Sequence, residues 1–303
     1  VMARIGVVCA GRVCAVLAAA FRSVGHEVVA VSGESEATRE RIAALLPGVE
    51  VCKPTDVARA ADLLLLTVPD DMLENVVVSL VGSGVIRKGQ YVAHTSGRHG
   101  LDVLRAAAEV GAHTIAMHPA MTFTGTALDL PRLKGCVFGV TAEDVARVEV
   151  QSLVDDLGGI AMFVAEDKRV LYHAGLAHGA NHLVTLVNQA MDILVEAGAE
   201  SPATVLKPLL EAALDNALTK GSEALTGPIV RGDVRTVQAH LDDLATSAPA
   251  SIPAYVAMAK ASANKAMLDG RLLGIRGARL ISILDHALAR YEGRVSTPEL
   301  NDR

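Results

Sequence analysis

The first half of the chain alternates short apolar runs with amphipathic stretches. Runs rich in β-branched and other apolar residues predict strands at residues 4–8, 27–31, 63–67, 91–94, 113–117 and 136–140. Helical periodicity fills segments between them, such as residues 36–46 and 70–81. An uninterrupted run such as Leu63-Leu64-Leu65-Leu66 suits a strand buried on both faces of a parallel sheet. The order predicts a doubly wound, Rossmann-like α/β domain, completed by a helix at 143–157 and a strand at 160–164.

After residue 165 the pattern becomes wholly helical. Helical periodicity runs through residues 168–197, 203–220, 234–245, 254–268 and 274–291, and Gly and Pro separate these segments. We therefore expect a dinucleotide-binding domain over residues 1–165, an all-helical substrate or dimerisation domain over 166–295, and a frayed tail over 296–303. Ligands of such folds bind outside the carboxyl ends of the strands, so an active site is expected between the two domains.

The first predicted strand leads into the turn Cys9-Ala10-Gly11-Arg12-Val13-Cys14, which aligns with the dinucleotide-binding pattern G-x-G-x-x-G. Gly11 keeps the second glycine, which lets the backbone approach a pyrophosphate at a helix N-terminus. Cysteine replaces the first and third glycines, and a side chain at Cys9 is costly if the backbone there needs a positive φ. The strand–turn–helix context favours dinucleotide binding over a purely structural turn. The expected contacts are Ala10, Gly11, Arg12 and Val13.

The end of the second predicted strand bears on the choice between NAD and NADP. NAD-specific sites place an Asp or Glu here to bind the ribose 2′-hydroxyl. This chain has Ser32 at that point, and Arg39 and Arg41 follow in the next predicted helix. An arginine can pair with the 2′-phosphate of NADP, whereas Glu34 counts against this interpretation. We predict NADP(H), with Ser32 and Arg39 at the 2′-phosphate; a solvated helix face is the alternative for the arginines.

The composition narrows the class of protein. Hydrophobic residues make up 51% of the 303 residues, as in a globular protein. A formal net charge of −6 leaves no basic stripe for nucleic-acid phosphates or an anionic membrane. The four cysteines include no C-x-x-C pair, and no apolar run approaches the about 18 residues of a membrane span. We therefore expect a cytoplasmic protein that binds neither nucleic acid nor membrane.

Several short motifs match one family. They are Thr67-Val68-Pro69-Asp70-Asp71, His94-Thr95-Ser96-Gly97, His118-Pro119, Tyr172-His173, Asn181 and, most specifically, Leu225-Thr226-Gly227-Pro228-Ile229-Val230-Arg231-Gly232-Asp233. With these motifs the chain resembles the Rossmann-like proteins that carry the domain of unknown function DUF2520. That family is similar to the ketopantoate reductase and pyrroline-5-carboxylate reductase superfamily, and has G-A-G-R-V-G at the first turn. The resemblance implies NADPH as cofactor, a small 2-keto acid as substrate and a homodimer.

The resemblance places catalytic residues on the first long helix after residue 165. His173 stands at the position of a lysine and Asn181 at that of an asparagine, which in ketopantoate reductases donate to the substrate carbonyl and hydroxyl. Eight residues of an α-helix rotate by about 80°, so both side chains are expected to face one cleft. A histidinium can supply the proton that must follow hydride delivery to a ketone. A histidine that only packs between domains is the alternative, and Lys168 is a rival acid.

Further polar residues at strand ends and in the Gly/Pro-rich loop are expected to contact the substrate. They are His118, Ser96, Thr226 and Arg231, and the resemblance places Val68 and Pro69 beside the nicotinamide ribose. Arg231 would bind a carboxylate in bidentate fashion, and helix caps or structural ion pairs are the alternatives. His178 and His182 have helical i,i+4 spacing but no third ligand nearby, so no metal is predicted.

These observations predict an NADPH-dependent reductase of a small 2-keto acid, with ketopantoate as the leading substrate. Another imine or keto-acid oxidoreductase of the same superfamily is the first alternative. The second is a non-catalytic NADP-binding sensor or scaffold, which the two cysteines of the turn would suit.

Overall fold

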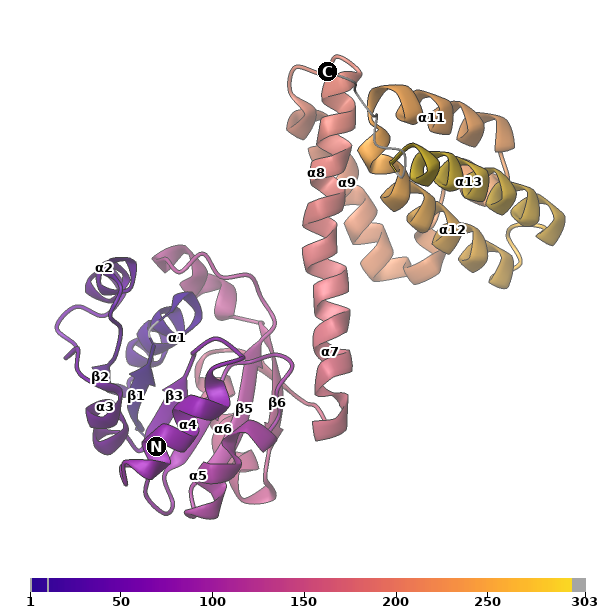
Figure 1. Cartoon of the computed structure of the whole chain (residues 1–303). Coiled ribbons are helices and arrows are strands. Elements are labelled where there is room, and N and C mark those ends of the chain that lie inside the picture. The colour runs from indigo at the N-terminus through magenta and orange to yellow at the C-terminus, as the bar shows by residue number, and fades with distance from the viewer. Residues whose placement is uncertain (1, 10, 296–303) are drawn as a thin grey trace, which may run out of the picture. The chain divides into compact units, whose positions relative to one another are not determined.

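The computed structural model describes residues 2–9 and 11–295, and its first half is built on one seven-stranded sheet (Figure 1). The strands are β1 (Arg4–Val8), β2 (Glu27–Val31), β3 (Leu63–Leu66), β4 (Tyr91–His94), β5 (His113–Pro119), β6 (Val137–Ala142) and β7 (Ile160–Phe163). Their order across the sheet is β2-β1-β3-β4-β5-β6-β7, and all neighbours are parallel except β5 and β6. The predicted doubly wound, Rossmann-like sheet is confirmed.

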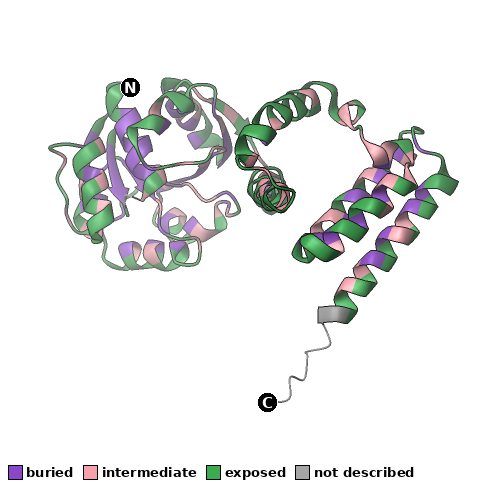
Figure 2. Cartoon of the chain, turned by 90° about the horizontal axis from the view of Figure 1, so that it is seen from above, coloured by how far each residue is buried: buried purple, intermediate pink, exposed green. Residues whose placement is uncertain are grey.

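Helices cover both faces of this sheet. One apolar cluster joins it to α1 (Arg12–Ser23), α2 (Glu36–Leu45) and α6 (Asp144–Asp156). The other joins it to α3 (Pro54–Ala60), α4 (Leu73–Gly82) and α5 (Arg105–Glu109). Because strand side chains alternate, Leu63 and Leu65 enter the first cluster and Leu64 and Leu66 the second. The strands and the inner helix faces are accordingly the buried part of this half of the chain (Figure 2).

The order of the strands creates a switch point between β1 and β3. From β1 the chain turns to β2 on one side, whereas from β3 it continues to β4 on the other. At such a point the connections diverge and leave a crevice outside the carboxyl ends of the strands. Cys9 and Thr67 directly follow these two strands and therefore stand at that crevice.

The chain divides into two compact units, residues 1–179 and 180–303, so that the boundary lies after the predicted one at residue 165. The difference arises because the segment after β7 packs on the sheet. Its helix α7 (Arg169–Leu176) carries Arg169, which is 1% exposed and bonds to the β6 backbone. The helix predicted over 168–197 is present over residues 169–196, and a π-helical turn at Ala177–Asn181 divides it into α7 and α8 (His182–Glu196).

The second unit is helical throughout its described part, as predicted. After α8 it contains α9 (Pro202–Lys220), α10 (Pro228–Arg231), α11 (Val234–Ser247), α12 (Ile252–Leu268) and α13 (Gly274–Val295). Its core lies among α11, α12 and α13, where Val237, Leu241, Ala263, Leu280 and Leu284 are fully buried. Asp233 begins α11 by accepting a hydrogen bond from the Thr236 N–H, at 3.2 Å.

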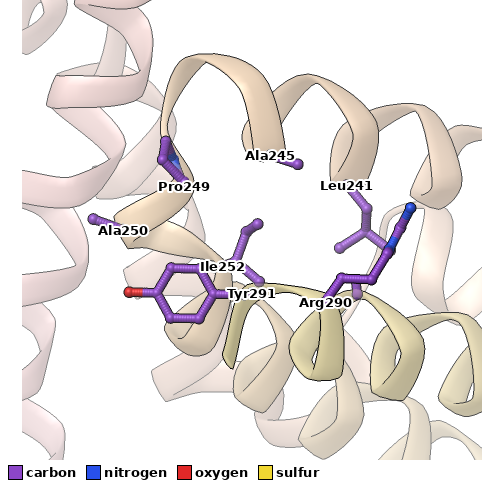
Figure 3. Close-up of a pocket in the computed structure, with 8 residues that line it drawn as sticks. Leu241, Ala245, Pro249, Ala250, Ile252, Arg290 and Tyr291 are labelled. Atoms are coloured by element: carbon purple, nitrogen blue, oxygen red, sulfur yellow. The ribbon is translucent and has the colours of Figure 1, made fainter. Parts of the chain in front are cut away.

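A hollow of about 400 Å³ opens among α11, α13 and the turn before α12 (Figure 3). Apolar side chains of Leu241, Ala245 and Ile252 line it, with Arg290 and Tyr291 from α13. None of the residues that the sequence nominates for a site lies on this hollow. It therefore adds nothing to the candidate site.

Candidate functional site

The turn after β1 is held by hydrogen bonds from three strand ends. Cys9 has a φ of +59° and is, in the described part of the chain, the one non-glycine residue with a positive φ. Its N–H donates to Ser32 Oγ at 3.0 Å, and its carbonyl accepts from Thr67 Oγ1 at 2.6 Å. These bonds join the ends of β1, β2 and β3 and compensate for a backbone conformation that disfavours a side chain.

The N-terminus of α1 opens beside this turn. Gly11 precedes the helix, no side chain caps it, and its first turn holds no acidic residue. Arg12 is exposed, Val13 is half-buried, and the predicted contact Ala10 lies outside the described residues. Cys14 is fully buried, and burial raises the pKa of its thiol, so it acts as a small apolar side chain at the third glycine position. Backbone N–H groups and the helix dipole favour an anion at such a terminus.

Two arginines meet at the loop after β5. A Cβ on Gly125 would lie 2.8 Å from Cγ of Arg12 and 3.0 Å from Nε of Arg41. Buried Asp129 fixes this loop, because its carboxylate accepts from the Gly125 N–H at 2.8 Å and from Thr124 Oγ1 at 3.0 Å. The side chains of Arg12 from α1 and Arg41 from α2 thus lie against the same glycine of this loop.

The two residues predicted at the 2′-phosphate are placed differently. Ser32 is 3% exposed, and its hydroxyl accepts the Cys9 N–H, so its side chain serves the turn. Arg39 is exposed on α2, whereas Arg41 is the arginine of that helix that approaches Arg12. The sequence shows both arginines, but only the fold distinguishes them.

A second polar cluster stands where β4 and β5 end. His118 Nδ1 lies 2.9 Å from the Tyr172 hydroxyl, and the His118 and His173 rings meet edge to face with centroids 5.9 Å apart. The loop after β4 passes directly over both imidazoles, because a Cβ on Gly97 would collide with His173 and lie 3.1 Å from Nε2 of His118. The structure therefore brings together His118 and His173, two of the predicted site residues.

The loop after β4 is shaped by His94 and Glu166. The buried His94 ring accepts the Ser96 N–H at Nδ1, at 3.1 Å, and donates from Nε2 to the Gly100 carbonyl, at 2.7 Å. Glu166 accepts the Leu101 N–H at 2.8 Å. The Ser96 hydroxyl accepts the His99 N–H at 3.2 Å, so this predicted substrate contact caps a turn of the loop.

Arg169 holds the cluster in place through hydrogen bonds to two backbone carbonyls, and no pattern in the sequence predicts this role. Its guanidinium donates to the Gly139 carbonyl at 2.9 Å and to the Ser96 carbonyl at 2.6 Å. Its Nε is buried without a hydrogen-bond partner. The rival acid Lys168 is exposed and paired with Asp167 instead. An arginine beside an exposed lysine at a helix start gives no sequence signal of burial.

The remaining predicted residues lie elsewhere. Val68 and Pro69 lie in the loop that connects β3 to α4, where Val68 is buried and Pro69 is exposed. Asn181, Thr226 and Arg231 are exposed residues of the helical unit, and their roles stay predictions. The π-helical turn removes the basis for the 80° rotation between His173 and Asn181, because that value assumes an uninterrupted α-helix.

Two domain models match the chain. A Rossmann-like domain matches residues 2–119, and the domain of unknown function DUF2520 matches residues 136–262. The chain thus consists of a Rossmann-like domain followed by a DUF2520 domain, which confirms the family resemblance of its motifs. No curated protein matches the sequence significantly.

Solved structures share the fold at low sequence identity. A candidate NADP oxidoreductase from Bacteroides fragilis is 19% identical, with a TM-score of 0.70 over 86% of this chain and 98% of that one. A reductive aminase from Aspergillus terreus, in complex with NADPH and ethyl levulinate, is 16% identical, with a TM-score of 0.58 over 96% and 95%. A 1-pyrroline-5-carboxylate reductase from Streptococcus pyogenes is 15% identical, with a TM-score of 0.55 over 96% and 99%.

Two further features of the described residues bear on the class of site. No group of three or more His, Cys, Asp and Glu side chains within residues 2–9 and 11–295 is arranged to hold a metal ion. Over the same part of the chain, no helix has both the length and the apolar character needed to cross a bilayer.

The positive φ of Cys9 gives a stability prediction. Cys9→Gly should raise the free energy of unfolding by about 1 kcal/mol, because glycine adopts this conformation without the Cβ clash. Cys9→Ala is the matched control and should leave the value nearly unchanged, since it keeps the Cβ. Urea unfolding followed by circular dichroism suits this chain, which has no Trp. Equal stabilisation by both variants would show that the thiol, and not the backbone, is the source.

The buried His94 and the half-buried His118 give a pH prediction. Burial lowers the pKa of His94 and of His118 to about 4, and for His118 the charges of Arg169 and His173 act in the same direction, opposed by Asp70. Between pH 6.5 and about 4 the unfolded chain therefore binds protons that the folded chain does not. The free energy of unfolding should fall as the pH drops through this window.

Urea unfolding at a series of pH values measures this dependence. His118→Asn should reduce the slope between pH 6.5 and 4, whereas His286→Asn, at an exposed position on α13, should leave it unchanged. An unfolding free energy that stays flat over this window in the unmodified protein would contradict the assignment of two neutral imidazoles.

Proposed function

We propose that this chain is an NADP(H)-dependent oxidoreductase that reduces a C=O or C=N bond of a small substrate. The observation that carries the proposal is the placement of two polar clusters at the same edge of the sheet. The arginines stand at the dinucleotide crevice beside β1, and the imidazoles stand where β4 and β5 end. The fold neighbours from Bacteroides, Aspergillus and Streptococcus support it, because their names describe NADP- or NADPH-linked enzymes or a reductase.

The donor set fits a phosphorylated dinucleotide. The uncapped N-terminus of α1, with Gly11 and Arg12, would hold the pyrophosphate. Arg41, which approaches Arg12 across Gly125, would hold the 2′-phosphate in place of Ser32 and Arg39. Glu34 is the carboxylate near this site, and its charge helps to raise the pKa of the Cys9 thiol. The positive charges of Arg12 and Arg41 together outweigh the single negative charge of Glu34, which favours NADP(H) over NAD(H).

The imidazoles suit the chemistry of reduction. Bound NADPH supplies a hydride to an electrophilic carbon, and the oxygen or nitrogen of the substrate then gains negative charge and needs a proton. His173 is the proposed proton donor, and His118 lies beside it to bind the same group. Asn181 as a second donor to the carbonyl and Arg231 as the carboxylate contact complete the proposal for a 2-keto acid, with ketopantoate as leading substrate.

Two alternatives stay within the proposal. A cyclic imine or other keto acid would use the same imidazoles, as the names of the aminase and pyrroline-carboxylate reductase neighbours suggest. A non-catalytic NADP-binding sensor would need the arginines but not the pair of imidazoles.

The compartment we propose is the cytoplasm, because all four cysteines are unpaired thiols.

Calorimetric titration with NADPH and NADH tests the cofactor. The unmodified protein should bind NADPH more tightly, and Arg41→Ala should weaken NADPH binding by about tenfold to a hundredfold, as expected for a lost charge-assisted hydrogen bond, with little effect on NADH. Arg39→Ala on the same helix is the control and should bind both as before. Absence of heat from either nucleotide would overturn the cofactor assignment. NADPH consumption with 2-keto acids and cyclic imines then separates an enzyme from a sensor.

We also propose that two copies of the chain pair through the helical unit. Every residue of α8 is described and none is buried, although Leu183, Val184 and Leu186 lie on it. On α9, Leu209 and Leu218 are 63% and 79% exposed. Apolar faces of this extent mark an interaction surface, and a second copy offers the same faces in return.

Light scattering of the purified protein after gel filtration tests this pairing. The unmodified chain should run as a dimer, and the double variant Leu209→Lys, Leu218→Lys should run as a folded monomer. Val148→Lys, at an exposed position on α6 in the first unit, is the control and should remain dimeric. A monomeric unmodified chain would contradict the proposal.

A further inference from the structure

Tyr172 lies between the sheet and His118. Its ring lies against the β6 backbone, where a Cβ on Gly139 would collide with it. The hydroxyl lies close to the Gly139 backbone, and its oxygen is 2.9 Å from His118 Nδ1. The two rings meet edge to face, with centroids 5.7 Å apart. Tyr172 is thus held by the sheet and in turn contacts the imidazole of β5.

This arrangement decides which nitrogen of His118 carries the proton. Within the described residues His118 Nδ1 is the hydrogen-bond partner of the Tyr172 hydroxyl, so the phenol has this nitrogen as the acceptor for its own hydrogen. A neutral imidazole that accepts at Nδ1 carries its hydrogen at Nε2. His94 shows the same logic in this molecule, since it accepts at Nδ1 and donates from Nε2.

The free nitrogen of His118 faces the candidate site. In the described part of the chain, the side-chain nitrogens and oxygens that are buried without a hydrogen-bond partner are His99 Nε2 and Arg169 Nε. Nε2 of His118 is not one of them, so this nitrogen is accessible to solvent. It points toward Gly97, 3.1 Å from where a Cβ would stand, and His173 lies on the same side.

The surroundings of His118 keep its ring neutral. Burial and the nearby charges of Arg169 and His173 lower the pKa of His118 to about 4, and Asp70 opposes them. At neutral pH the ring therefore offers one N–H and no net charge. A neutral imidazole in such a position polarises a carbonyl by hydrogen bonding, while a different group supplies the proton.

We propose that Tyr172 is a positioning residue that holds His118 as the Nε2–H tautomer, so that His118 donates a neutral hydrogen bond to the substrate oxygen or nitrogen. The proton itself comes from His173. This assignment rests on the proposed reductase function for its catalytic part, whereas the tautomer is a property of the folded chain alone. It separates the roles of two imidazoles that the sequence presents as equivalent.

The chain contains a matched control for this pair. In the helical unit, His240 Nδ1 lies 2.9 Å from the Tyr255 hydroxyl, and these rings also meet edge to face, with centroids 6.1 Å apart. Tyr255→Phe removes the same kind of phenol from the same kind of contact. It should change the His240 signals and leave those of His118 unchanged.

Nitrogen-15 NMR of the full chain labelled at histidine tests the tautomer directly, without any substrate. In the unmodified protein at neutral pH, His118 should show a protonated Nε2 and an unprotonated Nδ1. Tyr172→Phe should move both shifts toward the average of exchanging tautomers, while the circular dichroism spectrum stays that of the folded protein. A protonated Nδ1 in the unmodified protein would overturn the proposal, even if Tyr172→Phe failed to fold.

Kinetics test the catalytic part once a substrate is found. Tyr172→Phe should lower kcat by about tenfold to a hundredfold, the usual loss when a partner that orients a functional imidazole is removed, with the NADPH Kd unchanged. Tyr255→Phe should keep the kcat of the unmodified protein. An unchanged kcat in Tyr172→Phe would overturn the positioning role. Absence of turnover by the unmodified protein would overturn the proposed function, and the NMR result would still decide the tautomer.

Discussion

A buried guanidinium holds the candidate site together. Arg169 begins α7 and donates to carbonyls on the loop after β4 and on β6, so it spans the strand between them. That strand, β5, carries His118, whose position therefore depends on both ends of this bridge. Within the described residues no carboxylate forms an ion pair with Arg169; its hydrogen bonds go to carbonyl and hydroxyl oxygens, and the charge of Glu166 acts in its favour from further away. A buried charge of this kind fixes geometry more than it stabilises, because desolvation cancels much of the gain.

The parts of the fold that depend on local pattern were predictable from the sequence. The strands of the sheet begin and end within a few residues of the apolar runs, and the central run at β3 is buried on both faces, whereas the edge strand β7 is largely exposed. The antiparallel pairing of β5 with β6 could not be predicted from the apolar runs, since the direction of a strand depends on the whole connection that precedes it. The π-helical turn at Ala177–Asn181 also left no trace in the apolar periodicity.

The candidate site was predicted in part for the same reason. His118 and His173 follow motifs, and the structure places them in edge-to-face contact. Arg169 was not identified and Arg39 was chosen over Arg41, because the burial of Arg169 and the approach of Arg41 to Arg12 are long-range properties. The Ser32 hydroxyl, predicted as a ligand contact, accepts the Cys9 N–H in the structure, a long-range contact that the sequence does not show. Asn181, Thr226 and Arg231 stay predictions.

Three glycines give the site its shape by leaving space for other side chains. Gly97 makes room for His173, Gly100 for the Glu166 carboxylate and Gly139 for the Tyr172 ring. None of these glycines has a side chain to offer a ligand, yet a single methyl group at any of them would displace a neighbour that shapes the site. Replacement of any of these glycines would therefore reshape the site without removing a functional group from it. The outline of the site depends on atoms that are absent as much as on the imidazoles that are present.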